Sequence, residues 1–228
     1  MELFTDIYQR AAERKGGKKS LELLLQQESK YKNLSKTPDR DFLAEMTKKI
    51  FQSGFVWRVV ENKWDGFEEV FWGFEPYKLE LASDEQIERM AQDTRIIRNF
   101  TKVKSVRDNA FFVKEISDKH GNFGQFIADW PVQEITQLWL YLKKHGSRLG
   151  GNTGPYFLRT MNKDTFLLTR DVSSYLIRQG LVDRHPNSQR DLKLVQATFN
   201  DWQQQSGRTM ADISRAISYS FGENNPSL

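Results

Sequence analysis

Residues 148–153 have the composition of a phosphate-binding turn. The apolar segment 132–145 ends at Gly146, the glycine-rich sequence LGGNTG follows at residues 149–154, and Pro155 stands where the first turn of a helix tolerates it. The pattern therefore predicts two helices joined by a hairpin. Amides at the start of the second helix, together with its dipole, can hold a phosphate, and glycine lets a nucleic-acid backbone approach closely. A plain turn between two core helices fits the same pattern.

The charge of the chain is compatible with a polyanionic partner. The net charge is +4 and the isoelectric point is near 9.1. Basic residues cluster at 14–19, 95–107 and 143–148. A solvated helix end accounts for the first cluster, whereas the third adjoins the hairpin. The candidate DNA-phosphate ligands are Arg148, Gly150, Gly151, Asn152 and Thr153.

Several classes of chemistry are excluded by composition. The chain has no cysteine, and its histidines, His120, His145 and His185, are far apart and form no metal-binding pair. We therefore expect no metal and no cofactor. No apolar run approaches the about 20 residues that span a bilayer, and acidic residues occupy the start of the chain, where a secretory signal is basic and then apolar. We expect a cytoplasmic protein without a membrane partner, associated with the nucleoid if the source is a bacterium.

The elements that must position this hairpin are predicted to be helices. Apolar residues recur at helical spacing through most of the chain, and the clearest stripe, closed by Gly121, is Val103, Val106, Ala110, Val113 and Ile116. Alternation typical of a strand is limited to residues 165–169. The fold class is therefore all-α, with about ten helices.

The predicted organisation has three parts. Residues 1–34 form N-terminal helices, residues 35–160 form a central helical domain, and residues 161–228 form C-terminal helices that complete a second lobe. The helix–hairpin–helix is expected at residues 132–161.

About half of the chain, residues 51–160, resembles the DNA-3-methyladenine glycosylase I family of the helix–hairpin–helix superfamily. Five segments carry the resemblance. In order, they are QSGFVW at 52–57, FEP at 74–76, DTRIIRN at 93–99 with Lys102, the tripeptide Asp-Asn-Ala at 108–110, and KKHG at 143–146 with GNT at 151–153. The resemblance implies a bilobal helical fold that bends double-stranded DNA, flips out a damaged nucleotide and hydrolyses its N-glycosidic bond.

The chain departs from this family in its base pocket and its metal site. A Cys/His zinc site is ruled out by the absence of cysteine, and the family's N-terminal pocket Tyr and Trp have no clear match. The family's base-reading Glu falls at Lys49 or at Ile50, depending on one gap.

The C-terminal third is similar to the wider superfamily that includes endonuclease III. Asp171 follows Gly151 by 20 residues and precedes an apolar helix. The resemblance implies that this carboxylate stabilises the positively charged sugar and helps to orient water; an ordinary helix N-cap fits the same position. Bifunctional members carry a nucleophilic Lys where this chain has Pro155, so we expect a monofunctional enzyme.

Aromatic side chains could hold the flipped base by stacking. Trp57 aligns with the family's base-stacking Trp, and Phe55 and Trp64 are possible neighbours. A cationic alkylated purine would favour such stacking further. The remaining tryptophans are expected in the core; they are Trp72, Trp130, Trp139 and Trp202.

The sequence thus predicts a monomeric, monofunctional DNA glycosylase of base excision repair that acts on a 3-methyladenine-like alkylated purine in double-stranded DNA. An alternative is a non-catalytic damage-recognition protein that bends DNA on the same fold. A helix-turn-helix regulator is a weaker third interpretation, because neither a recognition helix nor a dimer interface is apparent.

Overall fold

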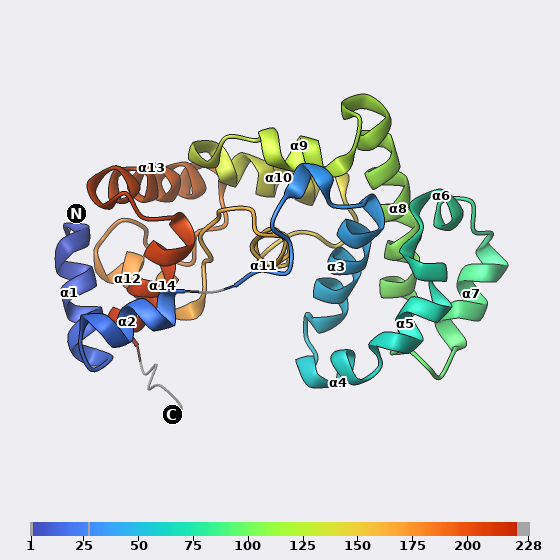
Figure 1. The fold of residues 1–228 in the computed structure, drawn as a ribbon, viewed down its shortest axis with the longest axis horizontal. Helices are drawn as coiled ribbons and strands as arrows, with labels where there is room; N and C mark the ends of the chain where they lie inside the picture. The colour runs from blue at the N-terminus through green and yellow to red at the C-terminus, as the bar shows by residue number, and fades with distance from the viewer. Residues whose placement is uncertain (1, 27, 223–228) are drawn as a thin grey trace. The chain divides into compact units, whose positions relative to one another are not determined.

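The computed structural model describes residues 2–26 and 28–222, and in these residues every regular element is helical. Fourteen α-helices and three short 3-10 helices follow one another along the described chain (Figure 1). The predicted all-α class is confirmed. Residues 165–168 are not helical, but no strand forms there or elsewhere in the described residues, so the expected extended segment has no sheet partner.

The chain divides into two compact units, and each unit is made of stretches that are distant in the sequence. The first unit comprises residues 1–30, 131–136 and 164–228, and the second comprises residues 31–130 and 137–163. The expected boundaries were 34/35 and 160/161. Unlike the expectation, residues 131–136 belong with the two ends of the chain.

The first unit joins the N-terminal helices to the C-terminal ones. Its elements are α1 (Phe4–Arg14), α2 (Lys18–Leu25), η3 (Val132–Glu134), α12 (Arg170–Arg178), α13 (Gln189–Ser206) and α14 (Met210–Ser220). Helix α1 packs against α14. The Glu2 carboxylate accepts hydrogen bonds from Arg10 at 2.6 Å and from the Tyr175 hydroxyl at 2.7 Å. These bonds connect the start of the chain to α12.

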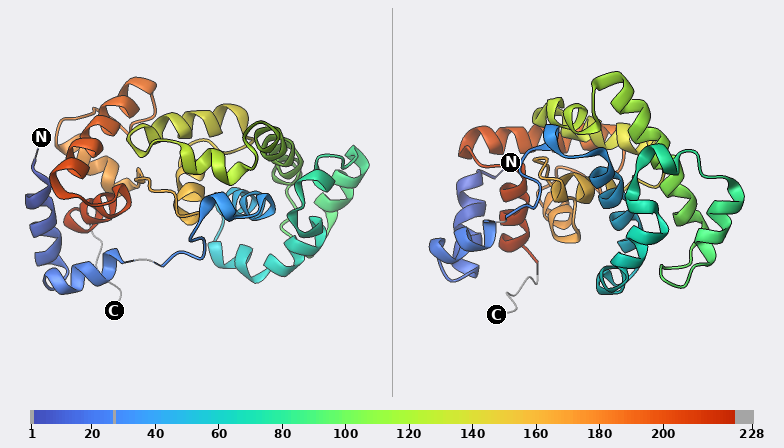
Figure 2. Two further views of the ribbon diagram at one scale, coloured as in Figure 1. Left: turned by 45° about the horizontal axis from the view of Figure 1, so that its top comes forward. Right: turned by 45° about the vertical axis from the view of Figure 1, so that its right-hand side comes forward.

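The second unit is built around its longest helix, α8 (Phe100–His120), against which α3 (Asp39–Gln52) packs (Figures 1 and 2). Its other elements are η1 (Leu34–Lys36), α4 (Trp57–Asn62), α5 (Trp64–Val70), η2 (Trp72–Phe74), α6 (Pro76–Leu79), α7 (Asp84–Gln92), α9 (Phe123–Asp129), α10 (Ile135–His145, whose first two residues lie in the first unit) and α11 (Thr153–Thr160).

Helix α8 forms for the reasons that its sequence indicates. The Asn99 side chain accepts the backbone N–H of Lys102 at the N-terminus, and Gly121 at φ 90° ends the helix. The stripe from Val103 to Ile116 is buried, as predicted. This apolar face supports the second unit's core, where each fully buried aliphatic side chain contributes about 1.5–3 kcal/mol.

Two further predictions have different outcomes. Ser83 and Gln86 form the reciprocal capping box that starts α7. Trp72, by contrast, was expected in the core but is 36% exposed. It lies in a tight turn with positive φ at Trp72 (52°), Gly73 (67°) and Phe74 (58°), and Phe74 is the buried side chain of the three. No helix in the described residues has the length and apolarity to cross a membrane.

Candidate functional site

A cavity of about 620 Å³ lies where the end of α3 and the start of α4 face the α10–α11 hairpin, and all of its lining residues belong to the second unit. The lining is Lys49, Gln52, Ser53, Gly54, Phe55, Val56, Trp57, Gly150, Gly151, Asn152, Thr153 and Tyr156. Two sequence segments with separate motifs thus meet at one site.

The first wall of the cavity is the turn between α3 and α4. Helix α3 ends where Gly54 takes φ 77°, a conformation that favours glycine. Lys102 then fixes this end of the helix, because its buried Nζ donates to the carbonyl oxygens of Phe51 at 3.2 Å and Ser53 at 2.7 Å. A cation is favourable at the C-terminal end of a helix dipole. Lys102, a residue of α8, therefore fixes the position of this turn.

Trp57, at the start of α4, presents an aromatic ring to the cavity. Its side chain is 49% exposed, which is uncommon for so large an apolar group. Its ring meets that of Tyr156 edge-on, with centroids 5.8 Å apart and planes at 88°. Tyr156 comes from α11, so the two walls of the cavity make contact through an aromatic pair.

Lys49 is the cation of this cavity. Its Nζ lies 5.5 Å from the centroid of the Trp57 ring and donates to Gln52 Oε1 at 3.2 Å. Burial lowers the pKa of Lys49, and the carboxylates of Glu45 and Glu61 oppose that shift. Of the two positions at which the sequence could place the family's pocket Glu, only Lys49 lines the cavity, since Ile50 is 1% exposed in the core.

The second wall is the hairpin of residues 146–152. Gly146 and Gly154 are tightly packed, because a Cβ atom would lie 2.5 Å from Leu149 Cδ1 at Gly146 and 2.7 Å from the Leu149 carbonyl oxygen at Gly154. Gly151 is different: φ is 60°, and a Cβ atom there would meet nothing within 4 Å. Its backbone therefore faces open space, as close approach of a ligand would require.

The other predicted hairpin residues are placed as follows. Arg148 is exposed and adopts φ 61°. Gly150 lies against the side chain of Lys143, whose Cγ would be 3.2 Å from an added Cβ. Asn152 is the N-cap residue of α11, and Thr153 is its first residue; both line the cavity.

Phe55 and Trp64, the two predicted neighbours of Trp57, have different surroundings. Phe55 lines the cavity, is 44% exposed, and has the Lys102 ammonium 4.7 Å from its ring centroid. Trp64 stacks on Phe67 and Phe74, each at 5.4 Å, and is not among the described residues that line the cavity.

Asp171 lies in the first unit, as the second residue of α12. The N-cap of that helix is Thr169, whose Oγ1 accepts the backbone N–H of Val172 at 3.3 Å. Asp171 is partly buried, and its carboxylate lies beside Gly222, where an added Cβ would be 2.5 Å from Oδ1. The N-cap of α12 is therefore Thr169, and Asp171 is not an N-cap residue.

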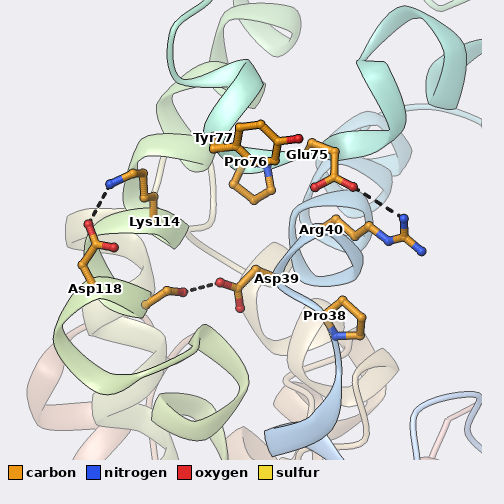
Figure 3. Close-up of a pocket in the computed structure, with 9 residues that line it drawn as sticks. Pro38, Asp39, Arg40, Glu75, Pro76, Tyr77, Lys114 and Asp118 are labelled. Atoms are coloured by element: carbon orange, nitrogen blue, oxygen red, sulfur yellow. Dashed lines mark hydrogen bonds and ion pairs between the residues drawn. The ribbon is translucent and has the colours of Figure 1, made fainter.

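A second cavity in the second unit, of about 450 Å³, has charged groups that pair with one another (Figure 3). Arg40 lies 3.5 Å from Glu75, and Lys114 lies 2.7 Å from Asp118. Asp39 accepts from Ser117 and from the Phe123 backbone N–H at 2.9 Å, which ties α3 to the α8–α9 connection. These groups are used in packing, so this cavity is a weaker candidate.

Gln52 and Tyr156 are among the cavity residues to which the sequence assigned no role there. Gln52 begins a matched motif, and Tyr156 is one of several apolar residues after the hairpin, but neither was assigned to the base pocket. Tyr156 follows Asn152 by four residues, so the two lie one helical turn apart. That spacing is the signal that could have identified it.

Comparison with known proteins relates this chain to DNA glycosylases. A family model described as methyladenine glycosylase matches residues 32–185, which is more than half of the chain. DNA-3-methyladenine glycosylase 1 of Escherichia coli is 29% identical over 76 residues, covering 33% of this chain and 41% of that protein. The chain thus spans about two-fifths of the length of the curated relative that it matches.

Two solved structures share the fold. The 8-oxoguanine DNA glycosylase of Methanocaldococcus jannaschii has a TM-score of 0.59 at 14% identity, covering 94% of this chain and 93% of that one. A mutant of 3-methyladenine DNA glycosylase I from Staphylococcus aureus has a TM-score of 0.52 at 21% identity, covering 66% of this chain and 90% of that one. The fold is therefore the helical one that these glycosylases share.

Proposed function

Because the chain belongs to the methyladenine glycosylase family, we propose that it is a monofunctional DNA glycosylase that flips an alkylated purine out of double-stranded DNA and hydrolyses its N-glycosidic bond. The observation that carries this proposal is the cavity that is lined both by the half-exposed ring of Trp57 and by the open, positive-φ Gly151 of the hairpin. A cavity that can take a base and a turn that can hold a phosphate are thus adjacent.

Binding begins at the hairpin. Helix α11 begins at Thr153, whose N–H donates to the Gly150 carbonyl oxygen at 3.3 Å, and its third residue, Pro155, carries no N–H. The phosphate site is therefore the hairpin itself, formed by Arg148, Gly150, Gly151, Asn152 and Thr153. The flipped base enters the cavity and stacks on Trp57, with Phe55 beside it; this contact recovers part of the few kcal/mol that unstacking costs.

Bond cleavage is assigned to Asp171. As the C–N bond stretches, the purine takes the electron pair and positive charge develops on the deoxyribose. The carboxylate stabilises that charge, and water adds to C1′ and gives up a proton, which goes to the departing purine if the lesion was uncharged and to solvent if it was a cation; an abasic site is left. Pro155 occupies the position where a lysine nucleophile would be expected, so no Schiff base forms there.

The test is to incubate the protein with DNA methylated at both nitrogen and oxygen atoms and to identify the released bases by mass spectrometry. We expect at least one methylated purine to be released and the strand to break at that site only after treatment with hot alkali. If damaged DNA is bound but no base is released, the protein recognises damage without excising it, and the proposed activity is wrong.

A further inference from the structure

Lys49 and Trp57 together suggest which bases the cavity accepts. Resting on the proposed function, we propose that Lys49 selects an uncharged alkylated purine that offers a hydrogen-bond acceptor, and that it disfavours the cationic N-methylated purines.

The position of Lys49 places a positive charge close to the ring of Trp57. Its Nζ lies 5.5 Å from the Trp57 ring centroid, within the range of a cation–π contact. Gln52, which is 3% exposed, holds that Nζ at 3.2 Å through its side-chain oxygen. A cationic base stacked on Trp57 would therefore lie near the protein's own ammonium, and the repulsion between the two charges weakens its binding.

The charges around the cavity act in the same direction. Among the described residues that line it, Lys49 is the only one with a formal charge at neutral pH, and there is no carboxylate. Glu45 and Glu61 lie outside the lining and favour the charged form of Lys49, whose pKa burial lowers. Glu45 Oε1 accepts a hydrogen bond from the Tyr31 hydroxyl at 3.2 Å, and Glu45 is not among the described residues that line the cavity.

The chemistry of the bases separates them by charge and by hydrogen bonding. A lysine ammonium donates hydrogen bonds and accepts none. Methylation at N3 or N7 uses the lone pair that would accept such a bond and adds a positive charge to the purine. Methylation at O6 leaves the N7 lone pair in place and the base uncharged. Lys49 therefore attracts the second kind and repels the first.

Two lesions that carry one methyl group on the same base make the test sharp. O6-methylguanine is uncharged, and N7-methylguanine is a cation at a mildly acidic pH at which it keeps its N1 proton. Each is placed in the same duplex on a 2′-fluoro sugar. The fluorine disfavours the sugar cation, so the base stays attached and equilibrium binding is measured without cleavage. We expect the affinity of the wild-type protein for the O6-methyl duplex to be at least about tenfold higher than its affinity for the N7-methyl duplex.

Charge variants of α3 test whether Lys49 is responsible. Lys49→Met should bring the two affinities close together, and Lys49→Glu should reverse their order, because the cavity then carries a carboxylate. The matched control is Lys48→Glu, which makes the same charge change at the next residue, where Nζ lies 4.6 Å from the Trp64 ring and does not line the cavity. This control should keep the wild-type preference.

The outcomes separate this inference from the proposed function. Equal binding of the two lesions by the wild-type protein, or an unchanged order in Lys49→Glu, overturns the selection by Lys49 even if methylated DNA loses bases. The expected preference in a protein that releases no base supports Lys49 and overturns the glycosylase activity. A borohydride-trapped adduct on a cleavable duplex, absent in Lys49→Met, would make Lys49 a nucleophile and overturn the proposal.

Discussion

The side chain of Asn109 and the backbone of Ser147 form two reciprocal hydrogen bonds. Asn109 Nδ2 donates to the Ser147 carbonyl oxygen at 3.0 Å, and the Ser147 N–H donates to Asn109 Oδ1 at 2.7 Å. Asn109 is fully buried in α8, and Ser147 starts the hairpin. Only an amide side chain offers a donor and an acceptor in this arrangement. The hairpin is therefore fixed in register on the longest helix of its unit.

The first prediction concerns this pair. Asn109→Leu should lower the free energy of unfolding by about 1–3 kcal/mol, because the partly buried backbone N–H and C=O of Ser147 both lose their partner. Amide hydrogen exchange at residues 146–152 should accelerate, since the hairpin loses its attachment. Asn62→Ala, at the exposed end of α4, should change stability by no more than about 0.5 kcal/mol. Unchanged exchange in Asn109→Leu would contradict a fixing role.

The second prediction separates backbone strain from DNA contact at Gly151. Gly151→Val should weaken binding to all duplex sequences, because the side chain fills the open space through which a phosphate approaches. Its strain cost should be about 1–2 kcal/mol, the usual penalty of the left-handed region. Gly207→Val is the control, since φ is 66° and the space there is also open. It should lose similar stability and keep DNA affinity, measured by fluorescence anisotropy at several salt concentrations.

The third prediction concerns stacking on Trp57. Trp57→Ala should weaken binding to a duplex with a damaged or abasic site by about 1–3 kcal/mol, the usual contribution of one base–aromatic stack. Undamaged duplex should be affected much less, and the melting temperature should change little, because the side chain is 49% exposed. Tyr156→Phe keeps the edge-on ring and should retain the binding. An equal loss for both duplexes would mean that Trp57 has no specific contact with the flipped base.

The sequence predicted those features of the fold that depend on residues close together in the chain. The α8 stripe, the capping box at Ser83 and the hairpin after His145 each depend on residues within a few positions of one another, and each is present in the structure. The exposure of Trp72 could not be predicted in this way, because positive φ values at Trp72 and Phe74 turn its side chain outward.

The identity of the pocket cation was within reach of the sequence. Leu43, Met46 and Ile50 share the buried face of α3, so the stripe assigns Ile50, and not Lys49, to the core. That phase decides between the two positions that the gap left open. The opposite wall of the cavity, in contrast, comes from residues 150–156, about a hundred residues away, and no periodicity connects the two segments.

The last prediction is that Asp171 provides the catalytic carboxylate. A fixed negative charge near the sugar has its greatest effect as the glycosidic bond breaks, and loss of one such group slows chemistry by about a hundredfold or more. Asp171→Asn keeps the shape of the side chain, so folding and DNA binding should persist while single-turnover excision slows. A neutral lesion is the stricter substrate, because its base leaves less readily.

The N-cap residue of α12, Thr169, supplies the control. Thr169→Ala removes the cap bond to Val172 and should cost about 1 kcal/mol of stability with excision retained. Gly222→Ala tests the same carboxylate from the other side, since the added methyl group would crowd Asp171 Oδ1, and it should slow excision. If Asp171→Asn excises a neutral lesion at the wild-type rate, or if Thr169→Ala loses as much activity as Asp171→Asn, then Asp171 is a structural residue of α12 and the carboxylate must be sought elsewhere.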